Sequence, residues 1–171
     1  MQLNDFIRDI PDWPKPGIVF KDITPLLKDP TAMAEAVQRM AAPYRDQRID
    51  IVTGAESRGF IFGIAVAQAL SAGFVPLRKP GKLPAKTISA EYDLEYGSAT
   101  LAMHVDAIAK GQRVLMVDDL LATGGTMAAS CQLVQKVGGR IAGICVLIEL
   151  TFLHGREKLT SYGPVHSIIQ V

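Results

Sequence analysis

Two adjacent carboxylates, Asp118 and Asp119, stand between a run of apolar residues and a loop of small residues. The apolar run 114–117 predicts a buried parallel strand, and open α/β sheets bind their ligands at the carboxyl ends of such strands. The residues of the loop are Ala122, Thr123, Gly124, Gly125 and Thr126. Apolar residues at helical spacing follow, so the loop is expected to open a helix. Backbone N–H groups and hydroxyls at a helix N-terminus suit a phosphate, and we refer to residues 122–126 as the phosphate loop.

The carboxylate pair indicates that this phosphate belongs to a sugar. Two acids beside a phosphate would repel it unless ribose hydroxyls, which donate hydrogen bonds, and a Mg²⁺ ion lay between them. The alternative is structural, because Asp-Asp can end a strand and Gly-Gly can make a turn without any chemistry. The loop lacks the Gly-Lys-Ser/Thr of nucleotide triphosphate loops and the Gly-x-Gly-x-x-Gly of dinucleotide folds.

The stretch Val-Asp-Asp-Leu-Leu-Ala-Thr-Gly-Gly-Thr at 117–126 resembles the phosphoribosyl-pyrophosphate motif of the type I phosphoribosyltransferases, in the form found in the adenine phosphoribosyltransferases. The resemblance implies transfer of phosphoribose to adenine, giving AMP and pyrophosphate. Asp118 and Asp119 would hold the ribose and stabilise its positive charge. Mg²⁺ is the expected cofactor, held mainly by substrate and water near these two acids.

Residues 17–25 resemble the adenine pocket of that family, which lies beneath a small hood. By this resemblance, backbone groups near Val19 and Lys21 read the base, while Phe20 stacks on its ring and Leu120 lies opposite. Many family members carry Arg at the position of Lys21, which leaves a backbone contact intact. Phe20 could instead be an ordinary core aromatic.

Cations follow two predicted strands. Arg58 stands at the start of a helix predicted over 60–70, where a cation opposes the helix dipole, so an anionic ligand is expected there. The stretch 55–59 also resembles the family's pyrophosphate loop. In the segment 78–82, Lys79 and Lys82 suit pyrophosphate by charge, although such a segment can also be a solvated turn. In relatives part of this cluster crosses a dimer interface, which implies a homodimer.

The polar segment 84–104 shows neither helical nor tidy strand periodicity, and it predicts a flexible loop that shields the site. A β-hairpin is the compatible alternative, with 99–104 as the return strand. Leu-Glu-Tyr-Gly at 94–97 resembles the family's catalytic loop. Glu95 is therefore the candidate to manage a proton on the purine, and Tyr96 is its neighbour in that loop.

The elements that must position these residues alternate along the chain. Alternating strands and helices predict a single α/β phosphoribosyltransferase domain over 1–171, with a mostly parallel twisted sheet flanked by helices. The hood would come mainly from residues 1–30. The predicted strands are 49–54, 73–77, 114–117, 141–150 and 165–171; the predicted helical stretches are 1–10, the helix that Asp29 caps and Pro30 begins, 60–70, the helix after the phosphate loop and 151–162.

Composition limits the other function classes. A net charge of +1 over 171 residues gives no electrostatic case for a nucleic-acid or membrane partner, so small-molecule substrates are expected. No secretory leader or membrane-spanning run is present, and buried, reduced Cys131 and Cys145 suit the cytoplasm. Two alternatives remain. One is a xanthine or hypoxanthine-guanine phosphoribosyltransferase, but no residues after Leu150 match those that recognise a 6-oxo base in such enzymes. The other is a non-catalytic phosphoribosyl-pyrophosphate sensor, which would be expected to carry an added basic face.

Overall fold

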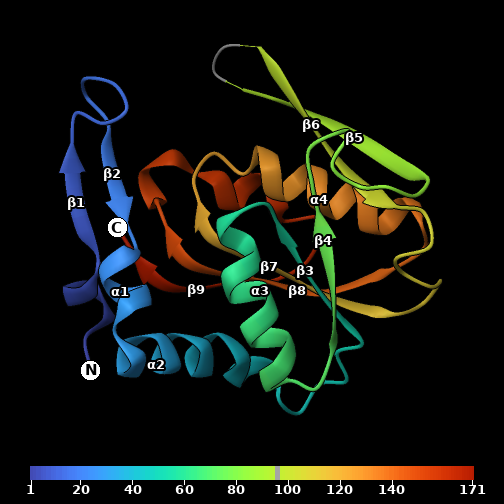
Figure 1. The fold of residues 1–171 in the computed structure, drawn as a ribbon, viewed down its shortest axis with the longest axis horizontal. Helices are drawn as coiled ribbons and strands as arrows, with labels where there is room; N and C mark the ends of the chain where they lie inside the picture. The colour runs from blue at the N-terminus through green and yellow to red at the C-terminus, as the bar shows by residue number, and fades with distance from the viewer. Residues whose placement is uncertain (95–96) are drawn as a thin grey trace.

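A five-stranded parallel sheet forms the centre of the molecule (Figure 1). The structure is a computed structural model that describes residues 1–94 and 97–171. The strand order is β4-β3-β7-β8-β9, and each neighbouring pair is parallel. Their bounds are β3 Ile51–Ala55, β4 Gly73–Leu77, β7 Arg113–Leu121, β8 Arg140–Glu149 and β9 Val165–Gln170. The predicted α/β fold class is confirmed.

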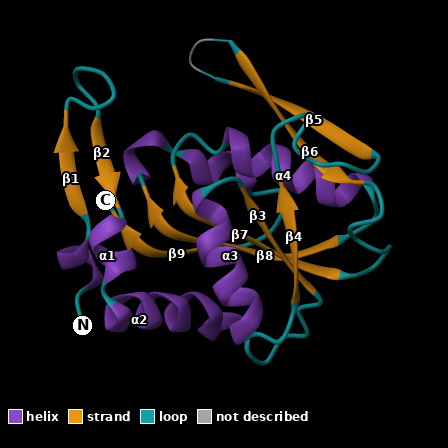
Figure 2. Cartoon of the chain, viewed as in Figure 1, coloured by secondary structure: helices purple, strands orange, loops and turns teal. Residues whose placement is uncertain are grey.

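Helices cover both faces of this sheet (Figure 2). The helices α1 (Thr24–Lys28), α2 (Pro30–Ala41) and α3 (Arg58–Ala69) pack on one face, and α4 (Gly125–Lys136) packs on the other. Strand β7 contributes to both cores, since Leu115 belongs to the same core as Phe62 of α3, whereas Met116 belongs to the same core as Leu133 of α4. Burial on two faces explains the unbroken apolar run that predicted this strand.

The strand order places a crevice at the carboxyl ends of β3 and β7. The connection from β3 leads to β4 on one side, and the connection from β7 leads to β8 on the other. Open α/β sheets bind ligands where the direction of strand succession changes in this way. The two stretches that carry the predicted acids and Arg58 therefore end beside each other.

The N-terminal segment differs from its predicted helix. A four-residue 3₁₀ helix, η1 (Leu3–Phe6), precedes strand β1 (Arg8–Pro11), which pairs antiparallel with β2 (Val19–Asp22). Ion pairs cross the ladder, with 2.6 Å between Arg8 and Asp22 and 2.8 Å between Lys21 and Asp9. The prediction of a helix over 1–10 is wrong because pairing with β2 outweighs the local helical pattern.

The described residues of the segment 84–104 form a β-hairpin, the compatible alternative to an irregular loop. Strands β5 (Thr87–Asp93) and β6 (Ser98–His104) pair antiparallel, so the expected return strand is confirmed. Residues 87–93 alternate polar and apolar types, a period of two that the prediction missed because alanine and tyrosine are weak hydrophobic markers. Lys136 at the end of α4 donates a hydrogen bond to the Ser89 carbonyl at 3.0 Å, and Arg78, directly after β4, forms an isolated β-bridge with Ala102. The hairpin is therefore bonded to α4 and to the segment after β4. Residues Glu95 and Tyr96 lie outside the described residues.

Other boundaries follow local sequence closely. Helix α2 begins at Pro30, and the Asp29 carboxylate accepts from the backbone N–H groups of Thr31 and Ala32 at 3.0 and 2.9 Å.

The predicted helix over 151–162 is instead two short 3₁₀ helices, η3 (Thr151–Leu153) and η4 (Gly155–Leu159). Another 3₁₀ helix, η2 (Ala42–Tyr44), follows α2. Both cysteines are buried free thiols. Within 1–94 and 97–171, no helix has the length and apolar character needed to cross a membrane.

Candidate active site

A cavity of about 280 Å³ lies at the carboxyl ends of β3 and β7. It gathers most of the predicted site residues, namely Arg58, Lys79, Asp118, Asp119, Leu120, Ala122, Thr123, Gly124, Gly125 and Thr126. The remaining lining comes from residues on the same strand ends, on α4 and on the β5–β6 hairpin: Ala55, Glu56, Ser57, Gly59, Tyr92, Leu101, Leu121 and Met127. The cavity therefore combines carboxylates, cations and a glycine-rich turn.

The phosphate loop leads directly into α4, as predicted. Gly124 is the N-cap residue and has a φ of +85°, in the left-handed region that favours glycine. A Cβ on Gly124 would lie 2.5 Å from the Gly155 carbonyl oxygen, so a side chain has no room there. The unpaired N–H groups at the start of this 12-residue helix favour a bound anion.

Asp119 offers an acceptor that the described protein groups leave unused. Its side chain is 7% exposed, and its Oδ2 lies 2.9 Å from Arg58 Nε without the alignment of a hydrogen bond. Within the described part of the chain, no other group donates to this buried oxygen. A ligand hydroxyl is a suitable donor, because a carboxylate oxygen accepts more than one hydrogen bond.

Asp118 lies in a different electrostatic setting from its neighbour. Its Oδ1 accepts from the Asp119 backbone N–H at 2.9 Å. Burial, and then the charge of Asp119, raises the pKa of Asp118 well above its ordinary value. A Cβ on Gly59 would lie 2.8 Å from Asp118 Oδ1, so the absence of a side chain at the start of α3 lets this carboxylate fit.

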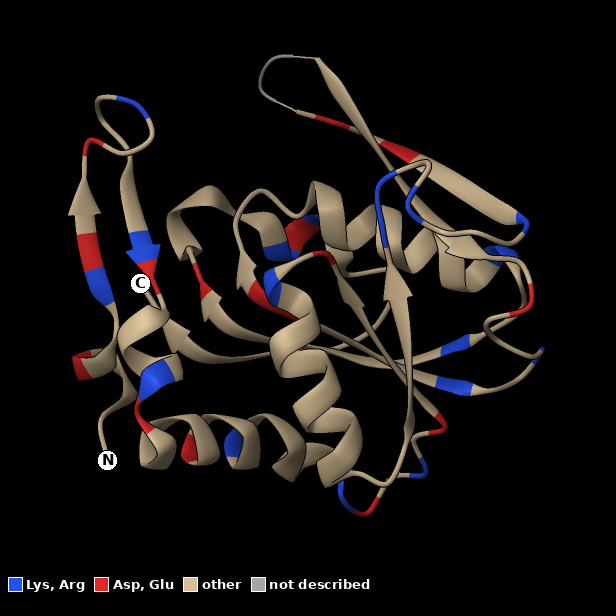
Figure 3. Ribbon diagram, viewed as in Figure 1, with Lys and Arg blue, Asp and Glu red and all other residues tan. Residues whose placement is uncertain are grey.

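Arg58 connects the hood to the acids. Its guanidinium carbon lies 5.2 Å from the centre of the Phe20 ring while Nε faces Asp119. In Figure 3, blue and red segments meet where α3 begins. A carboxylate of the chain itself thus offsets the cation that the helix dipole disfavours, and the predicted contact with pyrophosphate stays a prediction.

The cationic turn after β4 is held by Glu56, which the sequence reasoning did not single out. The Lys79 backbone N–H donates to Glu56 Oε1 at 2.8 Å, and Arg78 Nε lies 3.4 Å from the same oxygen. The hydrogen bond from Lys79 is the main cause that lowers the pKa of Glu56. Lys79 lines the cavity, whereas Lys82 is exposed outside the lining. The only sequence signal for Glu56 was an acid directly after a buried strand.

The predicted adenine-binding residues of the hood do not line this cavity. The rings of Phe20 and Trp13 meet edge to face with centres 4.5 Å apart, and Val19 is 48% exposed. Lys21 is engaged in its ion pair with Asp9. Leu120, their predicted counterpart, does line the cavity. Arg58 is therefore the contact through which Phe20 reaches the site.

The donor set fits a magnesium ion that arrives with its substrate. The described residues contain no cluster of three or more His, Cys, Asp or Glu side chains that could hold a metal. Of the three carboxylates at the cavity, Glu56 is engaged by the Lys79 backbone, which leaves Asp118 and Asp119, and one Asp119 oxygen is buried and unused. Mg²⁺ is commonly bound through one or two carboxylates together with substrate phosphates and water, which matches this set.

Comparisons with known proteins agree with one another. The phosphoribosyl transferase domain family matches residues 26–168. The adenine phosphoribosyltransferase of Kosmotoga olearia is 57% identical over 169 residues, covering 99% of each chain. The crystal structure of adenine phosphoribosyltransferase from Thermoanaerobacter pseudethanolicus superposes with a TM-score of 0.96 at 51% identity, over 99% of this chain and 98% of that one. The Giardia lamblia enzyme, complexed with 9-deazaadenine, has a TM-score of 0.93 at 39% identity, over 99% and 96% of the two chains.

Proposed function

This chain belongs to the phosphoribosyltransferase family, among its adenine phosphoribosyltransferases, and from that premise we propose how its residues join adenine to 5-phosphoribosyl 1-pyrophosphate. The products are AMP and pyrophosphate. The observation that carries the proposal is the convergence of Asp118, Asp119 and the phosphate loop on one cavity, with a buried Asp119 oxygen awaiting a donor.

The phosphate loop binds the 5′-phosphate, at a distance from the bond that breaks. Amides of Gly124 and Gly125 and the hydroxyl of Thr126 would donate to it at the start of α4. Asp118 and Asp119 hold the ribose hydroxyls between them. Fixing the sugar at both ends sets the anomeric carbon in position for attack.

The transfer forms one bond and breaks another at the anomeric carbon. Adenine N9 bonds to this carbon while the bond to pyrophosphate breaks, and the pyrophosphate oxygen keeps the electron pair. The acids stabilise the positive charge that develops on the sugar. Glu95 is proposed to manage the proton on the purine imidazole ring.

The leaving pyrophosphate is matched by cations. Arg58, Lys79 and Lys82 are proposed as its partners, and Lys79 already lines the cavity. Mg²⁺, carried by substrate oxygens and water near Asp118 and Asp119, supplies further neutralisation of phosphate charge.

The hood is proposed to select adenine. Backbone groups at Val19 and Lys21 would read the base edge, with Phe20 on one ring face and Leu120 on the other. The contact of Arg58 with Phe20 supports this, since it joins the hood to the site of chemistry. The Giardia lamblia relative bound to 9-deazaadenine supports the same class of base.

We also propose that residues 1–171 act as one domain in a cytoplasmic homodimer without nucleic-acid or membrane partners. On α3, Ile61 and Ile64 are 37% and 48% exposed and lie three residues apart on one helix face. Apolar side chains grouped on a surface favour self-association. Sedimentation should show dimers that Ile64→Asp weakens, and a monomeric parent chain would end this proposal.

A base panel tests the function. Adenine should be consumed with phosphoribosyl pyrophosphate and Mg²⁺, while hypoxanthine, guanine and xanthine react poorly. Comparable use of hypoxanthine would instead indicate another purine phosphoribosyltransferase. Binding of phosphoribosyl pyrophosphate without turnover of any base would indicate a sensor.

A further inference from the structure

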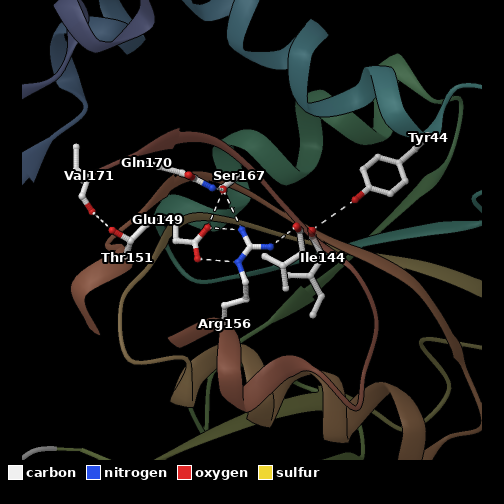
Figure 4. A network of polar contacts seen from close by, with 9 residues as sticks. Tyr44, Ile144, Glu149, Thr151, Arg156, Ser167, Gln170 and Val171 are labelled. Carbon is white, nitrogen blue, oxygen red and sulfur yellow. Dashed lines mark hydrogen bonds and ion pairs between the residues drawn. The ribbon is translucent and has the colours of Figure 1, made fainter. Parts of the chain in front are cut away.

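An ion pair between a buried carboxylate and a partly exposed arginine lies beside the phosphate loop, outside the cavity lining. Glu149 ends β8 with its side chain only 6% exposed, and Arg156 in η4 binds both of its carboxylate oxygens (Figure 4). The Arg156 Nε to Glu149 Oε1 distance is 2.9 Å. Neither residue lines the cavity. Substrate contact therefore does not explain why a charged pair is kept here.

The pair is fastened to the last strand of the sheet. The Ser167 hydroxyl donates to Glu149 Oε2 at 2.7 Å, and Arg156 Nη1 donates to the Val165 carbonyl at 2.6 Å. Gln170 donates to Ser167 at 3.0 Å. We refer to Glu149, Arg156, Ser167 and Gln170 as the Glu149 network. The hydrogen bond from Arg156 is the main cause that lowers the pKa of Glu149, so the pair stays charged at neutral pH.

Gly155, the residue before Arg156, lies directly against the backbone of the phosphate loop. A Cβ on Gly155 would lie 2.2 Å from the Ala122 carbonyl oxygen and 3.0 Å from the Gly124 nitrogen. The two segments thus touch backbone to backbone, with glycine on both sides. Gly155 directly precedes Arg156, so fixing the guanidinium fixes the segment against which the loop rests.

We propose that the Glu149 network positions the phosphate loop, with Arg156 holding Gly155 against Ala122 and Gly124 so that the loop keeps its phosphate-binding conformation. Affinity for the 5′-phosphate then depends on an ion pair that never touches the phosphate. This inference rests on the proposed function, because it assigns the loop to the phosphate of phosphoribosyl pyrophosphate and AMP.

The test compares AMP with adenosine, which lacks the phosphate, by calorimetric titration of Arg156→Met. AMP affinity should fall about tenfold or more, because losing a single hydrogen bond to the charged phosphate has an effect of that order, while adenosine affinity is retained. KM for phosphoribosyl pyrophosphate should rise by a larger factor than kcat falls, because the 5′-phosphate is bound in both the ground state and the transition state. Arg156→Lys, which keeps the charge, should restore part of the affinity.

Arg39→Met is the matched control. Arg39 also pairs with a glutamate, Glu35, and its side chain is 39% exposed against 40% for Arg156, yet its pair lies within α2. It should leave both affinities unchanged. Arg156→Met leaves Glu149 buried and without its charged partner, so the titrations are run below the unfolding temperature of this variant. Gly155→Ala then tests the contact between Gly155 and the phosphate loop while the ion pair is intact.

Equal losses for AMP and adenosine in Arg156→Met, or an unaltered AMP affinity in either Arg156→Met or Gly155→Ala, would overturn the inference. Failure of the parent chain itself to bind AMP would count instead against the proposed function. The two failures are therefore distinguishable.

Discussion

Replacing Gly124 by alanine should abolish most of the affinity for the 5′-phosphate. The added Cβ would lie 2.5 Å from the Gly155 oxygen, where ordinary contact begins at 3.4 Å, so one backbone must move by the difference, 3.4 − 2.5 = 0.9 Å. The left-handed φ adds a cost of about 1–2 kcal/mol. A hydrogen bond to a charged group contributes about 1.5–3 kcal/mol, so losing one to the phosphate should lower AMP affinity by about tenfold to 10²-fold.

The assay is titration with AMP and with adenosine, together with KM for phosphoribosyl pyrophosphate. Gly111→Ala is the control, because Gly111 has a φ of +87° but open space around its Cβ, at the opposite end of β7. It should lose stability and keep its AMP affinity. If Gly124→Ala bound AMP as tightly as the parent chain, the 5′-phosphate would lie elsewhere and the reasoning about this loop would be refuted.

Three further changes address the acids, the ion pair and the core. Asp119→Asn should lower kcat about 10²–10³-fold. It should also move the acid limb of the pH profile of kcat/KM to lower pH, because the charge of Asp119 that raises the pKa of Asp118 is lost. An unmoved acid limb would contradict the role given to this pair of acids. Glu149→Gln should lower the free energy of unfolding measured in urea at neutral pH. The difference from the parent chain should shrink as the pH falls below 4.5, the ordinary pKa of a glutamate, since the folded-state pKa of Glu149 is depressed. A difference that stays constant with pH would argue against the charged pair. In Gly143→Ala, the added Cβ would lie 2.8 Å from the ring of the buried Tyr44. This overpacking should cost about 1–3 kcal/mol of stability with KM unchanged. Unaltered unfolding in urea would show that the ring moves aside without cost.

The features that were predictable from sequence are those that nearby residues determine. The apolar run before Asp118 marks a strand buried on two faces, and Asp29-Pro30 marks a helix start. The phosphate loop is equally local, because its glycine N-cap and the helix after it are contiguous. The helix start at Asp29-Pro30 and the phosphate loop were therefore predicted at the correct positions, whereas β7 continues beyond the predicted 114–117 through both acids to Leu121.

The features that were missed depend on partners distant in sequence. Arg8–Pro11 is a strand only because residues 19–22 pair with it. Glu56 matters because it meets the turn at Lys79, and Gly155 matters because it meets the backbone of the phosphate loop. A single acid or glycine in a polar stretch carries no sign of which distant backbone it will contact.

The separation of the hood strands from the main sheet has an evolutionary consequence. Strands β1 and β2 pair with each other, and within the described ranges they form no ladder with the five-stranded sheet. The family match begins at residue 26, after both strands. Substitutions in the hood strands can therefore accumulate without breaking a strand pairing of the main sheet, provided that the contact of Phe20 with Arg58 is kept. Under the proposed function, such changes would alter the choice of base while the five-stranded sheet that carries Asp118 and Asp119 stays the same.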